Sequence, residues 1–416
     1  MPQWGWPFCI FTGLFTALVV APQASGDDWS SLWIGGILAG RGQWDDAYSI
    51  HPTDFSLTGS ALWDQLRVAE TTSNVAHPFV HNPGIAIFMS LVTSVTTFKV
   101  SLYLLSFLSG ACVPLMVALS YRFWVEKTID LYFLVPLSLV LWASEAMRSA
   151  LDLGQTSPLI FTACLAALAL ARRRPVLAAC LLAVAAFVKL TPLLVIAGFL
   201  LAPSYRRTGA YAAVASFGLF GASFLALWGA NTEWFRTLSA FSSKQLVSTM
   251  NCSLGSLLHA PKKGEAVVSA VDTLPGYNVL VAAVVVIMIG VFAWTCARLE
   301  RIPEKPLVVL SLLGPMLVAK ILWTHYTLAL VLPIVGILVA GLVMGERLHV
   351  LFSIFGGFVL LAPHHFSFAD MYNASAIANY VLWFFTVLIV AASTKLAQVG
   401  KIAVPGVSPC KVSSET

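Results

Sequence analysis

The chain has 416 residues, of which 58% are hydrophobic and only 10% are charged, and its net charge is +5. Ordinary soluble domains carry about 25% charged residues, so the composition excludes that class and indicates an integral membrane protein. The basic residues form small clusters rather than one basic face, which argues against a nucleic-acid partner.

The apolar runs are continuous rather than alternating, which favours helices over a β-barrel. We expect an all-α polytopic membrane protein that forms a single membrane domain over residues 1–416. Several runs are shorter than the roughly 20 residues that a straight span needs, so we expect about twelve transmembrane helices, within a range of about 11–13. The runs occupy residues 4–22, 84–97, 100–121, 130–147, 158–171, 175–188, 190–203, 209–229, 278–297, 306–322, 326–344, 349–362 and 378–395.

The first run, residues 4–22, has the length of a signal peptide, but its N-terminal stretch MPQWGWP holds no Lys or Arg and no clean cleavage site follows it. We therefore expect a retained helix. Directly behind it, SGDDWSSLWIGG places Asp27 and Asp28 at the start of an amphipathic helix. Carboxylates there can cap the helix by accepting its free amides, or they can serve a site outside the membrane.

Positive charge predicts the side on which each loop lies, because cytoplasmic loops are enriched in Lys and Arg. One consistent arrangement puts every basic cluster inside and leaves both termini in the cytoplasm of a multi-pass cell-membrane protein. Two large loops, 23–82 and 230–277, then lie outside, on the periplasmic or exterior face. The clusters placed inside are at residues 122–127, 172–174, 206–207, 298–305 and 347.

The run at 84–97 does not fit a simple alternation of spans. Loop 23–82 carries seven acidic residues against two arginines and therefore prefers the exterior, so both ends of the run face the same way. The economical solution is a re-entrant or interfacial segment introduced by His81-Asn82-Pro83-Gly84. If 84–97 does span, another short run fails to cross or the first loop lies in the cytoplasm.

A few polar residues on the predicted external side need an explanation, because ionisable groups at the membrane are costly. Lys189 interrupts LLAVAAFVKLTPLLVIAGFLL, where it either snorkels to the interface or meets an anion. Gln155 follows Gly154 in a helix junction, where an exposed turn is the simpler interpretation. His325 lies in WTHY and Asn251 in NCSLG, and each is weak evidence by itself.

Several catalytic and cofactor motifs are missing. The sequence holds no HExxH, paired CxxC, P-loop, GxSxG or GxGxxG pattern. A metalloprotease, a metal finger, an NTPase, a serine hydrolase and a Rossmann cofactor site are therefore disfavoured.

Taken in order, the polar stretches resemble glycosyltransferase family 87, the polyprenyl-phosphate-mannose-dependent mannosyltransferases. The most specific stretch is LGQTSPLIF, followed by an arginine-rich turn and a helix ending in Lys-x-x-Pro. The resemblance runs from Asp27 to about Pro333, with His81-Asn82-Pro83 where the family has Tyr-Pro-Pro. The other stretches are DWSSLWIGGILAGRGQWDDAYSI, HPFVHNPGIAIFMSLV, NCSLGSLL and WTHYTLALVLP.

The resemblance implies a C-type glycosyltransferase (GT-C) fold whose site faces away from the cytoplasm. It implies a polyprenyl-phosphate sugar as donor, a glycan or glycolipid as acceptor, and the lipid bilayer as the surrounding partner. It implies no cofactor and no nucleotide sugar, so that a DxD metal motif is not required. The sugar would be a hexose, mannose first.

Site residues follow from the same resemblance. The general base would be an aspartate at the start of the first external loop, with Asp28 ahead of Asp27. Lys189 and His325 would hold the donor phosphate. The remaining predicted contacts, for sugar, phosphate or acceptor stacking, are Gln155, Asn251 and Trp33.

A transporter or flippase of a lipid-linked sugar is the alternative from another class. Such proteins also have many spans with a few charges, but they more often show repeated halves and charges at the membrane midplane. Here the polar residues concentrate on one predicted external face, which favours the enzyme.

Overall fold

The computed structural model describes residues 5–259, 268–299, 303–361, 371–396 and 399. Within these residues the chain is overwhelmingly helical, and its strands β1 (Lys244–Val247) and β2 (Ser269–Asp272) form one antiparallel pair. The helices are α1 (Gly5–Val19), η1 (Ala21–Gln23), α2 (Asp27–Gly40), α3 (Trp44–Ala47), α4 (Ala61–Glu70), α5 (Pro83–Val95), α6 (Phe98–Val125), α7 (Leu131–Trp142), α8 (Glu145–Asp152), α9 (Ser157–Leu170), α10 (Pro175–Val188), α11 (Pro192–Leu201), η2 (Pro203–Tyr205), α12 (Arg206–Ala226), α13 (Trp228–Ser243), α14 (Leu254–Leu258), α15 (Tyr277–Leu299), α16 (Glu304–Val318), η3 (Thr324–Leu330), α17 (Val331–Met344), α18 (Arg347–Leu361), α19 (Met371–Ala391) and α20 (Ser393–Leu396).

Six helical stretches of the described chain are long and apolar enough to cross a membrane, or seven if the bent pair α7 and α8 is one span. The expectation of a helical multi-pass membrane protein is therefore confirmed. The larger number of about twelve counted short helices such as α9 and α10, each with 14 residues. At ~1.5 Å per residue they reach about 21 Å, short of a ~30 Å hydrocarbon core. The six stretches are Gly5–Gln23, Phe98–Val125, Pro203–Ala226, Tyr277–Trp294, Thr324–Met344 and Asn373–Ala391.

Two apolar regions of the sequence are interrupted in the structure. The run at 130–147, expected as one helix, breaks between α7 and α8 with a bend of 59°. Ser144 causes the new start, because its hydroxyl accepts a hydrogen bond from the Met147 amide at 3.2 Å. The second break lies at Lys189, which has extended backbone before Pro192 opens α11.

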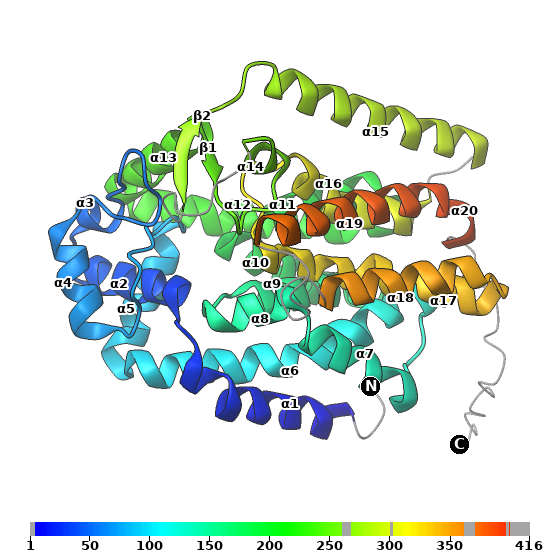
Figure 1. Cartoon of the computed structure of the whole chain (residues 1–416), viewed down its shortest axis with the longest axis horizontal. Coiled ribbons are helices and arrows are strands. Elements are labelled where there is room, and N and C mark those ends of the chain that lie inside the picture. Colours follow the sequence, from blue (N-terminus) through cyan, green and yellow to red (C-terminus); the bar gives the residue numbers. More distant parts are fainter. Residues whose placement is uncertain (1–4, 260–267, 300–302, 362–370, 397–398, 400–416) are drawn as a thin grey trace.

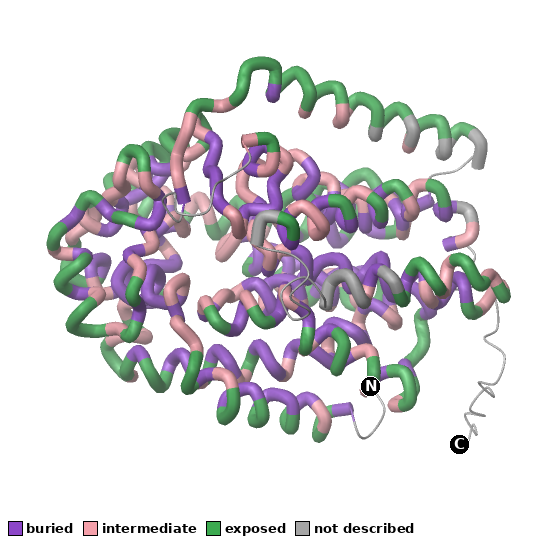
Figure 2. Tube along the Cα trace, in the orientation of Figure 1, coloured by how far each residue is buried: buried purple, intermediate pink, exposed green. Residues whose placement is uncertain are grey.

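The long helices run roughly along the longest axis of the molecule and form one bundle (Figure 1). α1 and α6 pack side by side, and the chain segments coloured as buried lie mainly in the middle of the bundle (Figure 2). α15 lies along the outer edge and is largely exposed, as Figure 2 shows. Its apolar surface is the kind that faces lipid.

A cap of shorter elements covers one end of the bundle, at the left of Figure 1. It consists of α2, α3, α4, α5, α13, β1 and β2. α5, which covers the predicted re-entrant run, has 13 residues and packs against α2 inside this cap. Its entry into the membrane stays a prediction.

Three of the predicted cytoplasmic clusters, at residues 122–127, 172–174 and 298–305, meet at the other end of the bundle. Glu126, which follows α6, forms ion pairs with Arg172 at 3.1 Å and with Lys305 at 3.0 Å. α6 has 28 residues, so this end lies about 42 Å from the start of the helix, where Phe98 packs in the core of the cap, at ~1.5 Å per residue. Loops that were grouped by charge alone therefore lie together.

Two glycines join the start of α2 to the junction between α8 and α9. Gly26 and Gly154 both have left-handed backbone, with φ of +65° and +68°. A Cβ on Gly154 would lie 2.7 Å from the Cβ of Trp29, so only glycine allows this approach. The contact brings the first turn of α2 against Gln155.

Candidate active site

Asp28 lies in the first turn of α2, but it does not cap the helix. The N-cap position is Gly26, and no side chain accepts a hydrogen bond there. Instead, the carbonyl of Leu153 accepts from the amides of Asp28 and Trp29, at 2.9 and 3.2 Å. The interpretation of the acidic pair as a helix cap is wrong, because backbone from the α8–α9 junction has taken that role.

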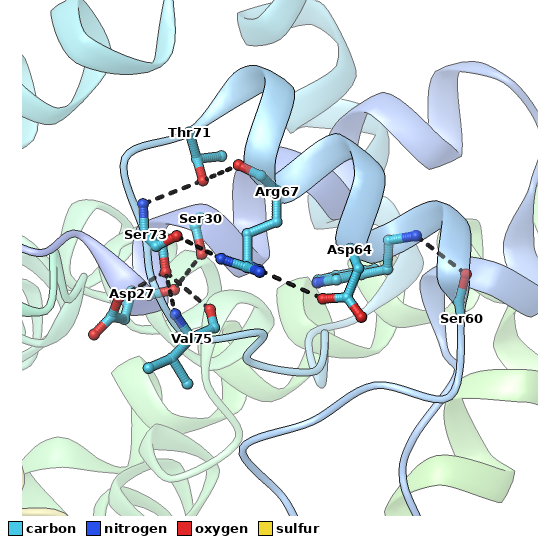
Figure 3. Close-up of polar contacts among 9 residues, drawn as sticks. Asp27, Ser30, Ser60, Asp64, Arg67, Thr71, Ser73 and Val75 are labelled. Atoms are coloured by element: carbon cyan, nitrogen blue, oxygen red, sulfur yellow. Dashed lines mark hydrogen bonds and ion pairs between the residues drawn. The ribbon is translucent and has the colours of Figure 1, made fainter.

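The two neighbouring aspartates point to different partners. Asp27 accepts a hydrogen bond from the hydroxyl of Ser73 at 2.6 Å, and its carbonyl accepts one from Ser30 at 2.6 Å. Figure 3 shows this contact beside Arg67, which donates to the Ser73 carbonyl at 2.9 Å. Asp27 therefore fastens the loop that follows α4.

Asp28 begins a chain of polar contacts that contains two of the other predicted residues. The amide nitrogen of Gln155 donates a hydrogen bond to Asp28 Oδ2. The amide oxygen of Gln155 accepts one from Lys189 Nζ at 2.9 Å, and Lys189 also donates to the hydroxyl of Ser157 at 2.8 Å. Three elements that are distant in sequence thus converge on one site.

Lys189 is held inside the protein rather than extended toward an interface. Its ammonium lies 4.8 Å from the centre of the Tyr326 ring, in addition to its two hydrogen bonds. Burial lowers the pKa of Lys189 from its ordinary value to about 8, while the Asp28 carboxylate acts in the opposite direction. These contacts direct the ammonium toward Gln155, Ser157 and Tyr326, which favours a contact with an anion in this site over snorkelling.

A cavity of about 310 Å³ lies where the cap meets the bundle, and its wall includes Asp28, Gln155, Lys189 and Tyr326. The volume falls within the range of about 300–1,000 Å³ typical of small-molecule sites. Aromatic side chains form much of its wall, together with the polar groups described above. The aromatic lining residues are Phe55, Phe187, Trp234, Phe241, Trp323 and Tyr326.

Two histidines of the cavity were not among the predicted site residues. His77 Nε2 lies 3.8 Å from Asp28 Oδ1. His81 Nδ1 lies 3.0 Å from the carbonyl oxygen of Val188, and burial lowers the pKa of His81 to about 4. The stretch HPFVHNP carries both, and its position before a proline-initiated helix was the available signal.

His325 lies next to the cavity but does not line it. It is buried, and its ring packs edge-on against Tyr326 with the ring centres 4.8 Å apart. Within the described residues neither ring nitrogen of His325 has a hydrogen-bond partner. Tyr326 occupies the wall position, so a contact between His325 and a phosphate stays a prediction.

Asn251, which was predicted to contact the substrate, instead holds backbone segments together. The side-chain amide of Asn251 donates to the carbonyls of Leu246 and Lys320, at 2.7 and 3.1 Å, and accepts from the amides of Ser253 and Leu322, at 3.1 and 2.9 Å. These bonds use the full capacity of the side chain, so the geometry does not support its predicted contact with substrate.

Trp33 is not part of the cavity wall either. Its side chain is 3% exposed and packs edge-on against Phe98, in the hydrophobic core of the cap. The prediction that Trp33 stacks on a sugar therefore lacks support. The tryptophans that do line the cavity are Trp234 and Trp323.

A family model, described as glycosyltransferase family 87, matches residues 79–322. This segment is more than half of the chain. The chain belongs to glycosyltransferase family 87. Membership in family 87 implies membrane glycosyltransferase activity, in agreement with the helical membrane architecture. No curated protein and no solved structure matches the chain.

The segment that matches family 87 contains Gln155, Ser157 and Lys189, together with His81 and Trp234. Asp28 and His77 lie before it. The structure joins the two parts, because Asp28 contacts Gln155 directly. The described residues hold no group of three or more His, Cys, Asp or Glu side chains that could bind a metal ion.

Proposed function

We propose that this protein transfers a hexose, mannose first, from a polyprenyl-phosphate sugar to a lipid-linked or glycan acceptor on the external face of the cell membrane. The observation that carries the proposal is the chain from Asp28 through Gln155 to Lys189 inside one cavity. It combines a proton acceptor with a cation that can hold phosphate. A single GT-C domain with about twelve spans and cytoplasmic termini belongs to the same proposal.

The proposed reaction is a direct displacement with Asp28 as general base. An acceptor hydroxyl oxygen attacks the anomeric carbon of the donor, and the bond between that carbon and the phosphate oxygen breaks. Polyprenyl phosphate leaves with the bonding electron pair, and the hydroxyl proton passes to the Asp28 carboxylate. A well-placed base contributes roughly 10²–10⁴-fold to such a step. His77 lies close enough to Asp28 to orient its carboxylate.

Lys189 is the proposed partner of the donor phosphate. A charge-assisted hydrogen bond from its ammonium stabilises the negative charge that grows on the leaving oxygen. Thr156 also lines the cavity, and its buried hydroxyl has no hydrogen-bond partner within the described residues. Gln155 would position the substrate while fixing the distance between base and cation.

The acceptor sugar is proposed to stack on Trp234 or Trp323, which replace Trp33 in this role. A transporter of a lipid-linked sugar is the second candidate, since a polar cavity with a lysine would also suit passage of a phosphate. However, transfer needs a base to take the proton of the acceptor hydroxyl, whereas passage of an intact lipid-linked sugar does not require one. The pairing of base and cation therefore favours transfer.

The test is to reconstitute the purified full chain in liposomes with polyprenyl-phosphate mannose, glucose or arabinose and a panel of glycan and glycolipid acceptors. We expect a new glycosidic product, detected by mass spectrometry, from a polyprenyl-phosphate donor and none from nucleotide sugars. Movement of the donor across the bilayer without product would identify a flippase and overturn the proposal.

A further inference from the structure

A second cavity, of about 240 Å³, lies at the end of the bundle opposite the cap. It is bordered by the end of α6, the end of α9 with the turn that follows it, η2 and the start of α16. Four cationic side chains line it, against one carboxylate and one phenol. The cations are Arg122, Arg172, Arg173 and Lys305.

The carboxylate in this cavity belongs to Glu126, and its backbone is unusual. Glu126 has φ of +63° at the C-cap of α6, and among the described residues no other non-glycine residue has a positive φ. This conformation costs about 1–2 kcal/mol for a residue with a Cβ. The strained position places the carboxylate between Arg172, at 3.1 Å, and Lys305, at 3.0 Å.

The cavity therefore keeps an excess of positive charge. Glu126 is the one carboxylate among its lining residues, whereas four cations face it, which leaves three positive charges without a counter-ion in the wall. Lys305 is also anchored to the carbonyl of Trp124 at 3.0 Å, so its ammonium is fixed in place. Basic residues whose role is to set the orientation of a membrane protein need no cavity between them. They also need no carboxylate in strained backbone to hold their side chains in place.

Apolar atoms complete the wall. Phe123, Leu168 and Ala169 line the cavity beside the cations. A ligand that matches both surfaces has a phosphate next to a hydrocarbon portion, which describes the headgroup region of an anionic phospholipid better than inorganic phosphate. Arginine side chains suit this ligand, because their forked donors match phosphate oxygens.

We propose that this cavity binds the phosphate of an anionic phospholipid headgroup. Helix α9 begins beside Thr156 in the candidate active site and ends at this cavity, so its 14 residues separate the two sites by about 21 Å at ~1.5 Å per residue. Glu126 acts as a positioning residue that holds Arg172 and Lys305 toward the phosphate. The site is separate from the proposed transfer reaction and does not depend on it.

The test measures lipid binding to the purified full chain by native mass spectrometry, with phosphatidylglycerol compared with phosphatidylcholine. The variant carries Arg172→Gln and Arg173→Gln, two exposed positions where substitution leaves packing intact. The matched control carries Arg174→Gln and Arg207→Gln, which remove the same charge from exposed positions outside the cavity wall. Thermal unfolding of all three proteins confirms that each is folded.

We expect the parent to bind phosphatidylglycerol more tightly than phosphatidylcholine. The cavity variant should lose about ten- to hundred-fold in affinity for phosphatidylglycerol, the size of effect expected for lost hydrogen bonds between charged groups. The control variant should keep the affinity of the parent. Equal binding of the two lipids would overturn the proposal, and so would an equal loss in the control. Inorganic phosphate that displaces the lipid at matched concentration would show a free-anion site and contradict the lipid assignment.

Discussion

At the scale of single residues, the site rests on two ionisable groups that were identifiable from the sequence. Asp28 and Lys189 stand out because a charge is costly near a membrane and needs a partner. Their mutual connection through Gln155 was not predictable, since it depends on folding three distant segments together. Asp27 and Asp28 have the same side chain, and only their directions on the first turn of α2 distinguish them.

The roles of residues in polar loops, and of tryptophans in helices, were harder to predict from the sequence. His77 lies in a loop where a polar residue needs no explanation, so the proline-initiated helix that follows HPFVHNP was the one signal for it before the contact with Asp28 was seen. Trp33 was assigned to substrate because tryptophan suits both a sugar platform and a core. Its helical spacing with Trp29 is the pattern of a buried face, and both side chains are buried.

The lowered pKa of Lys189 predicts a pH dependence. The ammonium is present below pH about 8 and is lost as the pH rises through that value, so kcat/KM for the donor should fall above pH about 8. Lys189→Arg keeps its charge and should move this decline to higher pH, whereas Lys189→Gln should lower kcat/KM by roughly 10²–10³-fold. Initial rates measured from pH 6 to 10 check this. If the decline of kcat/KM at high pH is the same in Lys189→Arg as in the parent, Lys189 is not the titrating group.

At the scale of elements, the junction between η1 and α2 determines where Asp28 points. The left-handed glycines Gly26 and Gly154 were visible in the sequence as turn residues, but their mutual contact was not. The breaks at Ser144 and Lys189 explain why the helices predicted from apolar runs of the sequence are longer than the helices in the structure. A polar side chain that starts or ends a helix can interrupt a run without changing its average hydropathy.

Gly154→Ala should disturb this junction. The substitution forces a Cβ into left-handed backbone and against Trp29, so the free energy of unfolding should fall by at least about 1–2 kcal/mol. Transfer activity should fall with it, because Gln155 moves away from Asp28. Gly218→Ala is the control. Gly218 lies within α12, and a Cβ on it would have no neighbouring atom within 4 Å. Thermal unfolding that is equal in the two variants would contradict the junction's role.

Asn251→Ala tests whether this side chain stabilises the fold or contacts the substrate. It leaves the backbone amides of Ser253 and Leu322 without this acceptor, whereas the two carbonyls keep a hydrogen bond from Gln245, so we expect a loss of roughly 1–3 kcal/mol in stability. The donor KM of the folded fraction should stay unchanged. A raised KM with normal stability would return Asn251 to the substrate site.

At the scale of the whole molecule, charge patterning predicted the organisation better than the count of spans. The basic loops at 122–127 and 172–174 and Lys305 meet at one end, and the candidate active site lies at the other. The number of spans was less predictable, because a 14-residue apolar helix can belong to a protein interior or to a thinned bilayer. Composition cannot distinguish these cases.

The orientation itself can be tested with single cysteines. Ser242→Cys lies in the cap, and Ser204→Cys lies in the turn before α12 at the opposite end, and both serines are exposed. We expect a membrane-impermeant maleimide to label Ser242→Cys in intact cells and Ser204→Cys only after the membrane is opened. The parent chain provides the background, since it contains the exposed Cys180. The reverse pattern would place the site in the cytoplasm.

The central claim is that Asp28, not its neighbour, removes the proton from the acceptor. The most direct measurement is sugar transfer from a polyprenyl-phosphate donor by Asp28→Asn and Asp27→Asn at saturating substrate. We expect kcat to fall by roughly 10²–10⁴-fold in Asp28→Asn. Asp27→Asn should keep most of its activity, because its role is the contact with Ser73. Full activity in Asp28→Asn, or an equal loss in Asp27→Asn, would contradict the account.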